Sequence, residues 1–191
     1  MKNISDQKGF TLVELAIVMA IIGLLIGAVL KGQAMIDDAK IKRLMNDLQG
    51  ISAGYFTYYD RYNALPGDDT AAAARWAGVA NGDGSGYVDG TAIPPGGESL
   101  KAWQALRFAG LLSGDPAAAT APGNPYAGTY GLDSNAYGGT TGTKNRIVVS
   151  NLPGSVAQIV DSKFDDGVWD TGTVRGSAAY NGGTITLYYF L

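Results

Sequence analysis

Residues 8–30 read KGFTLVELAIVMAIIGLLIGAVL, and this stretch decides the fold of the chain. The run from Phe10 to Leu30 is apolar almost throughout, and a helix of roughly 20 such residues is long enough to cross the hydrocarbon core of a membrane. Glu14 interrupts the run. A charged side chain at membrane depth costs about 2.5 to 3.5 kcal/mol. Glu14 is therefore either a tolerated charge near the end of an ordinary membrane anchor or a functional residue.

The order of residues around Glu14 favours a function. A short polar leader ends in KG (residues 8–9), and FTLVE (residues 10–14) opens the apolar run. Over residues 1–50 the chain closely resembles the type IV pilins and the pseudopilins of type II secretion. The resemblance implies that a prepilin peptidase cuts the chain between Gly9 and Phe10, on the cytoplasmic side of the membrane, and methylates the new amine of Phe10.

The same resemblance gives Glu14 a partner. After cleavage the Phe10 amine is a cation at the end of an apolar helix, and we expect Glu14 of a neighbouring subunit to neutralise it in the low-dielectric core of a filament. Four small residues at steps of four, three and four share another helix face, where they allow a second helix to approach closely. The alternative is that small residues are simply common in membrane helices. The four residues are Ala16, Ala20, Gly23 and Gly27.

The leader, residues 1–9, differs from a secretory signal, which has a shorter apolar core and a small-residue cleavage site after that core. The basic residues conflict with the cleavage motif. Two lie before the apolar run and four follow it closely, so the positive-inside rule alone favours the opposite orientation in the membrane. These residues are Lys2 and Lys8 before the run, and Lys31, Lys40, Lys42 and Arg43 after it. We give the cleavage motif precedence, because the peptidase works from the cytoplasm.

The composition excludes several classes of activity. The 191 residues contain no histidine and no cysteine, which removes Ser-His-Asp and Cys-His catalysis and the usual zinc sites. Charged residues make up 16% of the chain and its formal net charge is -3, so it lacks the basic face of a nucleic-acid-binding protein. We therefore expect no enzyme activity and no specific nucleic-acid partner. Without cysteine the chain also lacks the disulfide of many type IV pilins.

The helix continues beyond the membrane segment, because residues 32–62 contain no proline and keep a helical period. The positions that follow this period, at steps of four and three, are Ile36, Lys40, Leu44, Leu48, Ile51, Tyr55 and Tyr59. The sequence thus predicts one long helix with a transmembrane and assembly half over residues 10–31 and an amphipathic half over residues 32–62. Residues 63–191 then form a globular head domain.

Two shorter helices are predicted in the first part of the head. Residues 70–79 form a short helix for which Asp68 or Asp69 is the N-terminal cap. Residues 99–109 form a longer one, which Gly110 ends.

Strands are predicted nearer the C-terminus. Residues 146–152 and 184–191 are rich in β-branched and aromatic residues, and residues 173–176 are a weaker candidate. A short helix capped by Ser155 lies between strands, whereas residues 113–145 form a long loop with at most short strands. The fold class is α+β: a long helix packed on a small antiparallel sheet, with short helices and long glycine-rich loops, as the resemblance to pilins implies.

Residues 81–89 read NGDGSGYVD and space oxygen-bearing residues at every second position, with glycine sixth and an apolar residue eighth. This is the first part of an EF-hand-like calcium loop, in which Tyr87 contributes its carbonyl. The expected ligands are Asn81, Asp83, Ser85, Tyr87 and Asp89. The twelfth position is Ala92 instead of a bidentate glutamate, so the alternative is a glycine-rich turn with solvated carboxylates. Glu98 or Asp68 supplies a missing ligand only if the fold brings it near.

Residues 161–170 read DSKFDDGVWD, which resembles a DxKxDDG pattern near the C-termini of pilin-like proteins. Adjacent carboxylates usually cap turns and bond backbone amides, and we expect that role here. A metal site formed by Asp165, Asp166 and Asp170 is the alternative.

Together these features predict a structural subunit of a type IV pilus-like filament, polymerised through its N-terminal helix. The alternatives are a pseudopilin of a type II secretion system and a membrane-anchored binding module that does not polymerise. The expected partners are copies of itself and related pilins, the prepilin peptidase, the inner membrane, and the pilus or secretion assembly machinery. We expect the precursor in the bacterial inner membrane and the mature protein in a cell-surface or periplasmic filament. Calcium is the one cofactor that the sequence suggests.

Overall fold

The computed structural model describes residues 9–118, 120–135 and 144–191. The helices in these residues are α1 (Leu12–Tyr62), α2 (Ala72–Arg75), α3 (Glu98–Phe108) and α4 (Gly154–Phe164). The strands are β1 (Tyr130–Asp133), β2 (Arg146–Pro153), β3 (Val174–Gly176) and β4 (Thr184–Phe190). The chain divides into two compact units, Met1–Ala39 and Lys40–Leu191, and α1 contributes residues to both.

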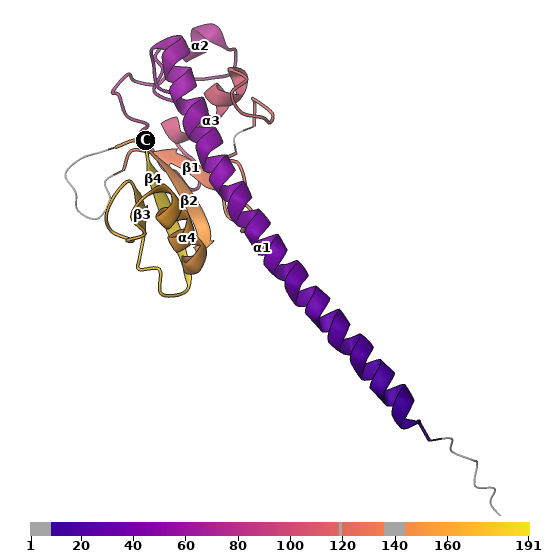
Figure 1. Cartoon of the computed structure of the whole chain (residues 1–191). Coiled ribbons are helices and arrows are strands. Elements are labelled where there is room, and N and C mark those ends of the chain that lie inside the picture. The colour runs from indigo at the N-terminus through magenta and orange to yellow at the C-terminus, as the bar shows by residue number, and fades with distance from the viewer. Residues whose placement is uncertain (1–8, 119, 136–143) are drawn as a thin grey trace, which may run out of the picture. The chain divides into compact units, whose positions relative to one another are not determined.

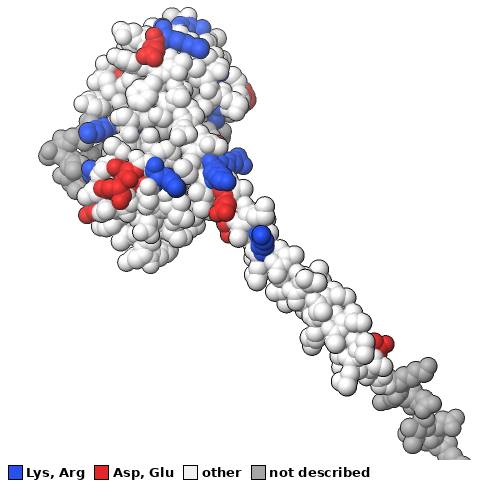
Figure 2. Space-filling model, viewed as in Figure 1, with Lys and Arg blue, Asp and Glu red and all other residues white. Residues whose placement is uncertain are grey.

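The first unit contains the apolar part of α1. This is the one helix of the described residues that is long and apolar enough to cross a membrane. Every large apolar side chain from Phe10 to Leu30 is exposed. Charged side chains are sparse, with only Glu14 and Lys31 between residues 9 and 36, and Figure 2 shows this part of α1 as an almost uncharged surface. Such a surface requires a lipid or protein environment.

The second unit begins with the amphipathic part of α1. Its buried apolar side chains come from Leu44, Leu48, Ile51, Tyr55 and Tyr58. The prediction is confirmed from Leu44 to Tyr55. It is wrong for Ile36, which is 56% exposed, and for Tyr59, which is 45% exposed while Tyr58 is fully buried. Three residues after Tyr55 the helix brings Tyr58 to the buried face. Four residues after Tyr55 the helix has turned past one full turn, so Tyr59 lies away from that face.

The sheet of the second unit is antiparallel, with the strand order β1-β2-β4-β3 (Figure 1). The predictions for β2, β3 and β4 are confirmed within a few residues. Strand β1 lies inside the segment that was expected to be mainly loop, and its four residues pair with β2 from Tyr130 opposite Val149 to Asp133 opposite Arg146. The α+β fold class is confirmed.

Strand register divides the side chains of the sheet between two faces. On one face, apolar side chains join the core with residues of α1, α3 and α4. These sheet residues are Tyr130, Leu132, Ile147, Val149, Leu152, Val174, Ile185 and Leu187. The other face carries a buried ion pair between Arg146 and Asp133, with 2.6 Å between Nε and Oδ1, and the Arg146 guanidinium lies over the Tyr188 ring. The sheet therefore has one apolar face and one mixed face, on which Val148 and Tyr188 lie beside the ion pair.

Helices α3 and α4 complete the core. Trp103 and Leu106 of α3 are fully buried, as are Ala157 and Val160 of α4. Helix α3 ends as predicted, with Gly110 in the left-handed region at φ 69°.

Two of the predicted helix caps are wrong. Helix α4 begins one residue before Ser155, and Pro153 at its N-cap makes no side-chain capping bond. Helix α2 covers four residues instead of the predicted 70–79. The N-cap of α2 is Ala71, so neither aspartate at residues 68–69 is the cap, although Oδ1 of Asp69 accepts the N–H of Ala71 at 2.9 Å.

Candidate functional site

The first candidate site is the start of α1, where Thr11 and Glu14 bond each other reciprocally. The Thr11 backbone N–H and its hydroxyl both donate to Oε2 of Glu14 at 2.9 Å. The Glu14 backbone N–H donates to Oγ1 of Thr11 at 3.2 Å. This is a capping box, in which two side chains satisfy the free N–H groups at a helix start.

The capping box adds a role for Glu14 that the sequence analysis did not assign. Residues 11–14 read TLVE, which is the S/T-x-x-E signature of a capping box before an apolar run, so the signal was present in the sequence. Among the described residues Glu14 makes its bonds to Thr11 alone. The carboxylate therefore stabilises the start of its own helix.

The small-residue face of α1 is open. A Cβ atom added at Gly23 or Gly27 meets no atom within 4 Å. Ala16 and Ala20 are exposed as well. This face is free for contact with another helix.

The second candidate site is the glycine-rich loop at residues 81–89, which closes around the carboxylate of Asp68. Oδ1 of Asp68 accepts the N–H groups of Gly84 and Ser85 at 2.6 and 2.9 Å, and Oδ2 accepts that of Gly86 at 2.8 Å. Asp68 is 4% exposed. The loop is therefore held by a buried carboxylate outside its own sequence.

Glu98, the first residue of α3, holds the same loop at both ends. Its Oε1 accepts the N–H of Asp83 at 2.9 Å, and its Oε2 accepts the N–H of Asp89 at 3.1 Å. The carboxylates of Asp68, Asp83 and Glu98 offer oxygen atoms within 4.8 Å of one another. The fold thus brings near both residues that the sequence named as sources of a missing ligand.

The other expected ligands of the loop have separate partners. Oδ1 of Asn81 accepts the N–H of Ala73 at 2.8 Å, and Oδ1 of Asp89 accepts the hydroxyl of Ser134 at 3.1 Å. The Ser85 hydroxyl is 3.4 Å from the Tyr87 carbonyl. The structure places Asp83 in a three-carboxylate group with Asp68 and Glu98, which an EF-hand pattern does not describe.

The electrostatics of this group reflect two opposed effects. Burial raises the pKa of Asp68, while the amides of Gly84, Ser85 and Gly86 favour its ionised form. Hydrogen bonds from Ser85 lower the pKa of Asp83. An oxygen-only set of this kind suits a hard cation such as calcium.

The third candidate site is the acidic segment that spans the last turn of α4 and the loop after it, where each of three carboxylates bonds backbone amides. Asp161 accepts the N–H of Gly167 at 3.2 Å and the hydroxyl of Tyr180 at 2.7 Å. Asp165 accepts the N–H groups of Thr173 and Val174. These bonds are the turn-forming role that the sequence analysis expected.

Asp166 completes the turn, accepting the N–H of Val168 at 2.8 Å and the hydroxyl of Thr171 at 2.6 Å. Oxygen atoms of Asp161, Asp165 and Asp166 lie within 4.8 Å of one another. Asp170 is exposed and lies outside this group.

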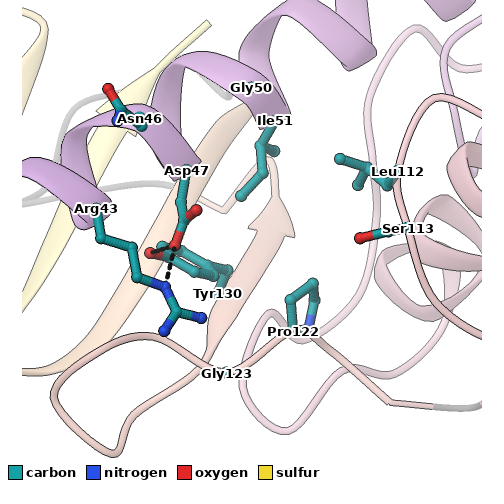
Figure 3. Close-up of a pocket in the computed structure, with 10 residues that line it drawn as sticks. All are labelled: Arg43, Asn46, Asp47, Gly50, Ile51, Leu112, Ser113, Pro122, Gly123 and Tyr130. Carbon is teal, nitrogen blue, oxygen red and sulfur yellow. Dashed lines mark hydrogen bonds and ion pairs between the residues drawn. The ribbon is translucent and has the colours of Figure 1, made fainter.

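A hollow beside α1 is lined by residues of the helix, the segment after α3, and β1 (Figure 3). Its volume is about 260 Å³. The side chains of Arg43 and Tyr130 both point toward Asp47, with 3.7 Å from Nε of Arg43 to Oδ2 and 2.9 Å from the Tyr130 hydroxyl to the same oxygen. Ile51, Leu112 and Pro122 supply apolar surface. The Asp47–Tyr130 bond ties α1 to the sheet within the second unit.

Comparison with known proteins gives information on the first candidate site, the start of α1. Residues 4–30 match a family model described as the prokaryotic N-terminal methylation motif. No curated protein and no solved structure matched the chain. The motif is the prepilin signature, and it indicates a type IV pilin-like or pseudopilin protein. The long apolar helix and the small antiparallel sheet are a pilin-like architecture.

The motif also bears on processing, assembly and membrane anchoring. It implies processing by a prepilin peptidase and assembly together with membrane machinery. With the apolar helix, it is consistent with anchoring of the precursor in the inner membrane. Proteins of this kind are structural components and not enzymes.

Proposed function

We propose that this protein is a structural subunit of a type IV pilus-like filament, cleaved between Gly9 and Phe10 and polymerised through its N-terminal helix. The observation that carries the proposal is the methylation motif at residues 4–30, which coincides with a helix whose apolar side chains are all exposed. These side chains are exposed among the described residues, and packing against identical helices in a filament would cover them.

Cleavage has a direct test. Protein purified from the membranes of a host that contains a prepilin peptidase should have an intact mass that lacks residues 1–9 and includes one added methyl group on Phe10. A peptidase-deficient host provides the control and should yield the full-length chain. A full-length chain in both hosts contradicts the proposed processing.

Assembly depends, in this proposal, on the pairing of Glu14 with the Phe10 amine of a neighbouring subunit. Glu14→Val removes both the charge and the capping box, whereas Glu14→Gln removes the charge and retains an acceptor for the Thr11 N–H, since glutamine also completes a capping box. We expect both variants to insert into the membrane and both to lower filament yield severely, measured by shearing and sedimentation without wild-type subunit present.

The two variants separate pairing from capping. Normal filament yield from Glu14→Gln with reduced yield from Glu14→Val means that the cap is sufficient, and that result refutes the charge pairing.

The alternative assembly is the pseudopilus of a type II secretion system, which uses the same motif and the same helix. Deletion of the gene distinguishes the two: loss of surface filaments supports the pilus, and accumulation of secreted proteins in the periplasm supports the pseudopilus. A chain that is anchored but never found in a sedimenting filament is the membrane-bound binding module.

We also propose calcium as a ligand of the second unit, bound by Asp68, Asp83 and Glu98. The support is the proximity of their carboxylate oxygens, within 4.8 Å of one another. A cation there would offset repulsion among three acidic side chains and stabilise the loop in a protein that has no disulfide.

A further inference from the structure

A second hollow of the Lys40–Leu191 unit lies between α4 and the loop that follows it. Its volume is about 310 Å³, at the lower end of small-molecule sites. The lining residues are Gln158, Gly167, Val168, Trp169, Tyr180 and Asn181. The hollow is thus bounded by two aromatic residues, two amide side chains and one aliphatic side chain, and none of the lining residues carries a charge.

We propose that this hollow binds a neutral saccharide. Aromatic rings are large, rigid surfaces against which the C–H groups of a sugar ring pack, and Trp169 and Tyr180 supply them. Amide side chains donate and accept hydrogen bonds at once, as sugar hydroxyl groups do. Gln158 and Asn181 are exposed, and their side chains make no hydrogen bond to another described residue, so both remain available to a ligand.

The acidic segment at the end of α4 and in the loop after it builds the walls of the hollow. Asp161 holds the Tyr180 hydroxyl through one carboxylate oxygen and the Gly167 N–H through the other. Asp166 holds the N–H of Val168, which is 46% exposed at the edge of the hollow. The carboxylates fix the loop that presents Trp169 and are not among the residues that line the hollow, so they are positioning residues.

The charge of this segment selects among saccharides. Asp161, Asp165 and Asp166 lie together, and Asp161 and Asp166 bond residues that line the hollow. An anionic sugar would be repelled by these carboxylates, whereas a neutral sugar would not. The ligand class is therefore uncharged, and the site does not depend on the proposed role in a filament, because its residues all lie in the Lys40–Leu191 unit.

Saturation-transfer NMR tests the proposal on the full-length protein in a zwitterionic detergent without a sugar headgroup. The probes are glucose, galactose, N-acetylglucosamine and their β-linked oligomers, with glucuronic acid as the charged comparison for glucose. At least one neutral sugar should receive saturation on its ring C–H protons with a millimolar dissociation constant, and glucuronic acid should receive none. The proposal is overturned if no neutral sugar receives saturation, or if glucuronic acid receives as much saturation as the neutral sugars.

Substitutions locate the site. Trp169→Ala should weaken binding at least about tenfold, as expected when an aromatic anchor is removed. The double variant Gln158→Ala with Asn181→Ala removes exposed amides that support nothing in the fold, so it should weaken binding while leaving the melting temperature unchanged. Phe56→Ala removes a half-exposed aromatic residue in another part of the unit and should bind as wild type does.

Each outcome for the variants decides the assignment. Unchanged binding by the Gln158/Asn181 double variant overturns it even if Trp169→Ala fails to fold. Loss of binding in Phe56→Ala places the sugar elsewhere and also overturns it. Binding of an apolar peptide in place of any sugar identifies a protein-docking surface and overturns the saccharide.

Discussion

The Asp161 carboxylate shows how one buried side chain makes the stability of the fold depend on pH. The side chain is fully buried between α4 and the following loop. Burial raises its pKa, the hydrogen bonds from Tyr180 and Gly167 oppose the rise, and Asp166 and Asp165 add to it. The folded state therefore holds the Asp161 proton more tightly than the unfolded chain does.

The sign of the pH effect follows from this difference. Protonation of Asp161 favours folding, so its contribution is fully present below the ordinary carboxyl pKa of about 3.8 and is lost as pH rises through the raised pKa. We expect the free energy of unfolding of wild type, relative to that of Asp161→Asn, to increase as pH falls across this window. Urea unfolding of the detergent-solubilised protein at a series of pH values measures it.

Asp170→Asn is the matched control, because Asp170 is an exposed aspartate of the same segment. Because Asp161 is still present in this variant, its difference from Asp161→Asn should increase as pH falls, as that of wild type does. A difference between wild type and Asp161→Asn that is constant with pH contradicts the assigned coupling.

At the scale of elements, the strands were predictable because their signal is local. Clusters of β-branched and aromatic residues mark β2 and β4, and the structure agrees within one or two residues. Strand β1 was missed because YGLD has little local preference and is stabilised by pairing with β2. Helix α2 ends at Arg75 because the next residue, Trp76, has an extended backbone.

The loop at residues 81–89 shows that local sequence is also insufficient to predict the residues of a site. Its spacing resembled a calcium loop, whereas the carboxylates that bond its amides, Asp68 and Glu98, lie in other elements. A pattern of spacing within one segment does not contain a contact that chain topology creates. The sequence named both residues only as conditional ligands.

Calcium binding to this loop has a measurable effect on stability. A ligand that binds only the folded state stabilises it by about 2.7 kcal/mol at a hundredfold excess over its dissociation constant. We expect the melting temperature to be higher with calcium than with chelator in wild type, and expect Asp83→Ala to abolish the shift, since Asp83 belongs to both ligand sets.

Asp89→Ala distinguishes the two sets. The shift should survive this substitution if Asp68, Asp83 and Glu98 hold the ion, and should vanish if the EF-hand-like residues do. Identical melting of wild type with calcium and with chelator shows that the loop is stabilised by its amide bonds alone.

At the scale of the whole molecule, the division after Ala39 implies that the Lys40–Leu191 unit has its own core. Every residue of the main hydrophobic cluster belongs to this unit, from Leu44 to Leu187. We expect the fragment from Lys40 to Leu191 to be soluble and to unfold cooperatively, with a free energy of unfolding of about 5 to 15 kcal/mol. Urea unfolding followed by fluorescence and by circular dichroism measures it.

Leu48→Ala tests whether α1 forms part of that core in the fragment. Leu48 is fully buried, so the substitution should cost about 2 to 5 kcal/mol. Lys42→Ala, at an exposed position of the same helix, should cost little. A gradual unfolding transition, or equal effects from the two substitutions, contradicts an independent core.

The reciprocal bonds of Thr11 and Glu14 also bear on when subunits become able to join a filament. While the bond between Gly9 and Phe10 is intact, the nitrogen of Phe10 is an uncharged amide, and among the described residues Glu14 bonds Thr11 of its own helix. In the assembly proposed above, proteolysis at that bond would turn the nitrogen into an amine and supply the cation for a neighbour's carboxylate. On this mechanism uncut subunits accumulate in the bilayer without assembling. The rate of cleavage by the peptidase then sets the rate at which subunits become able to join the filament.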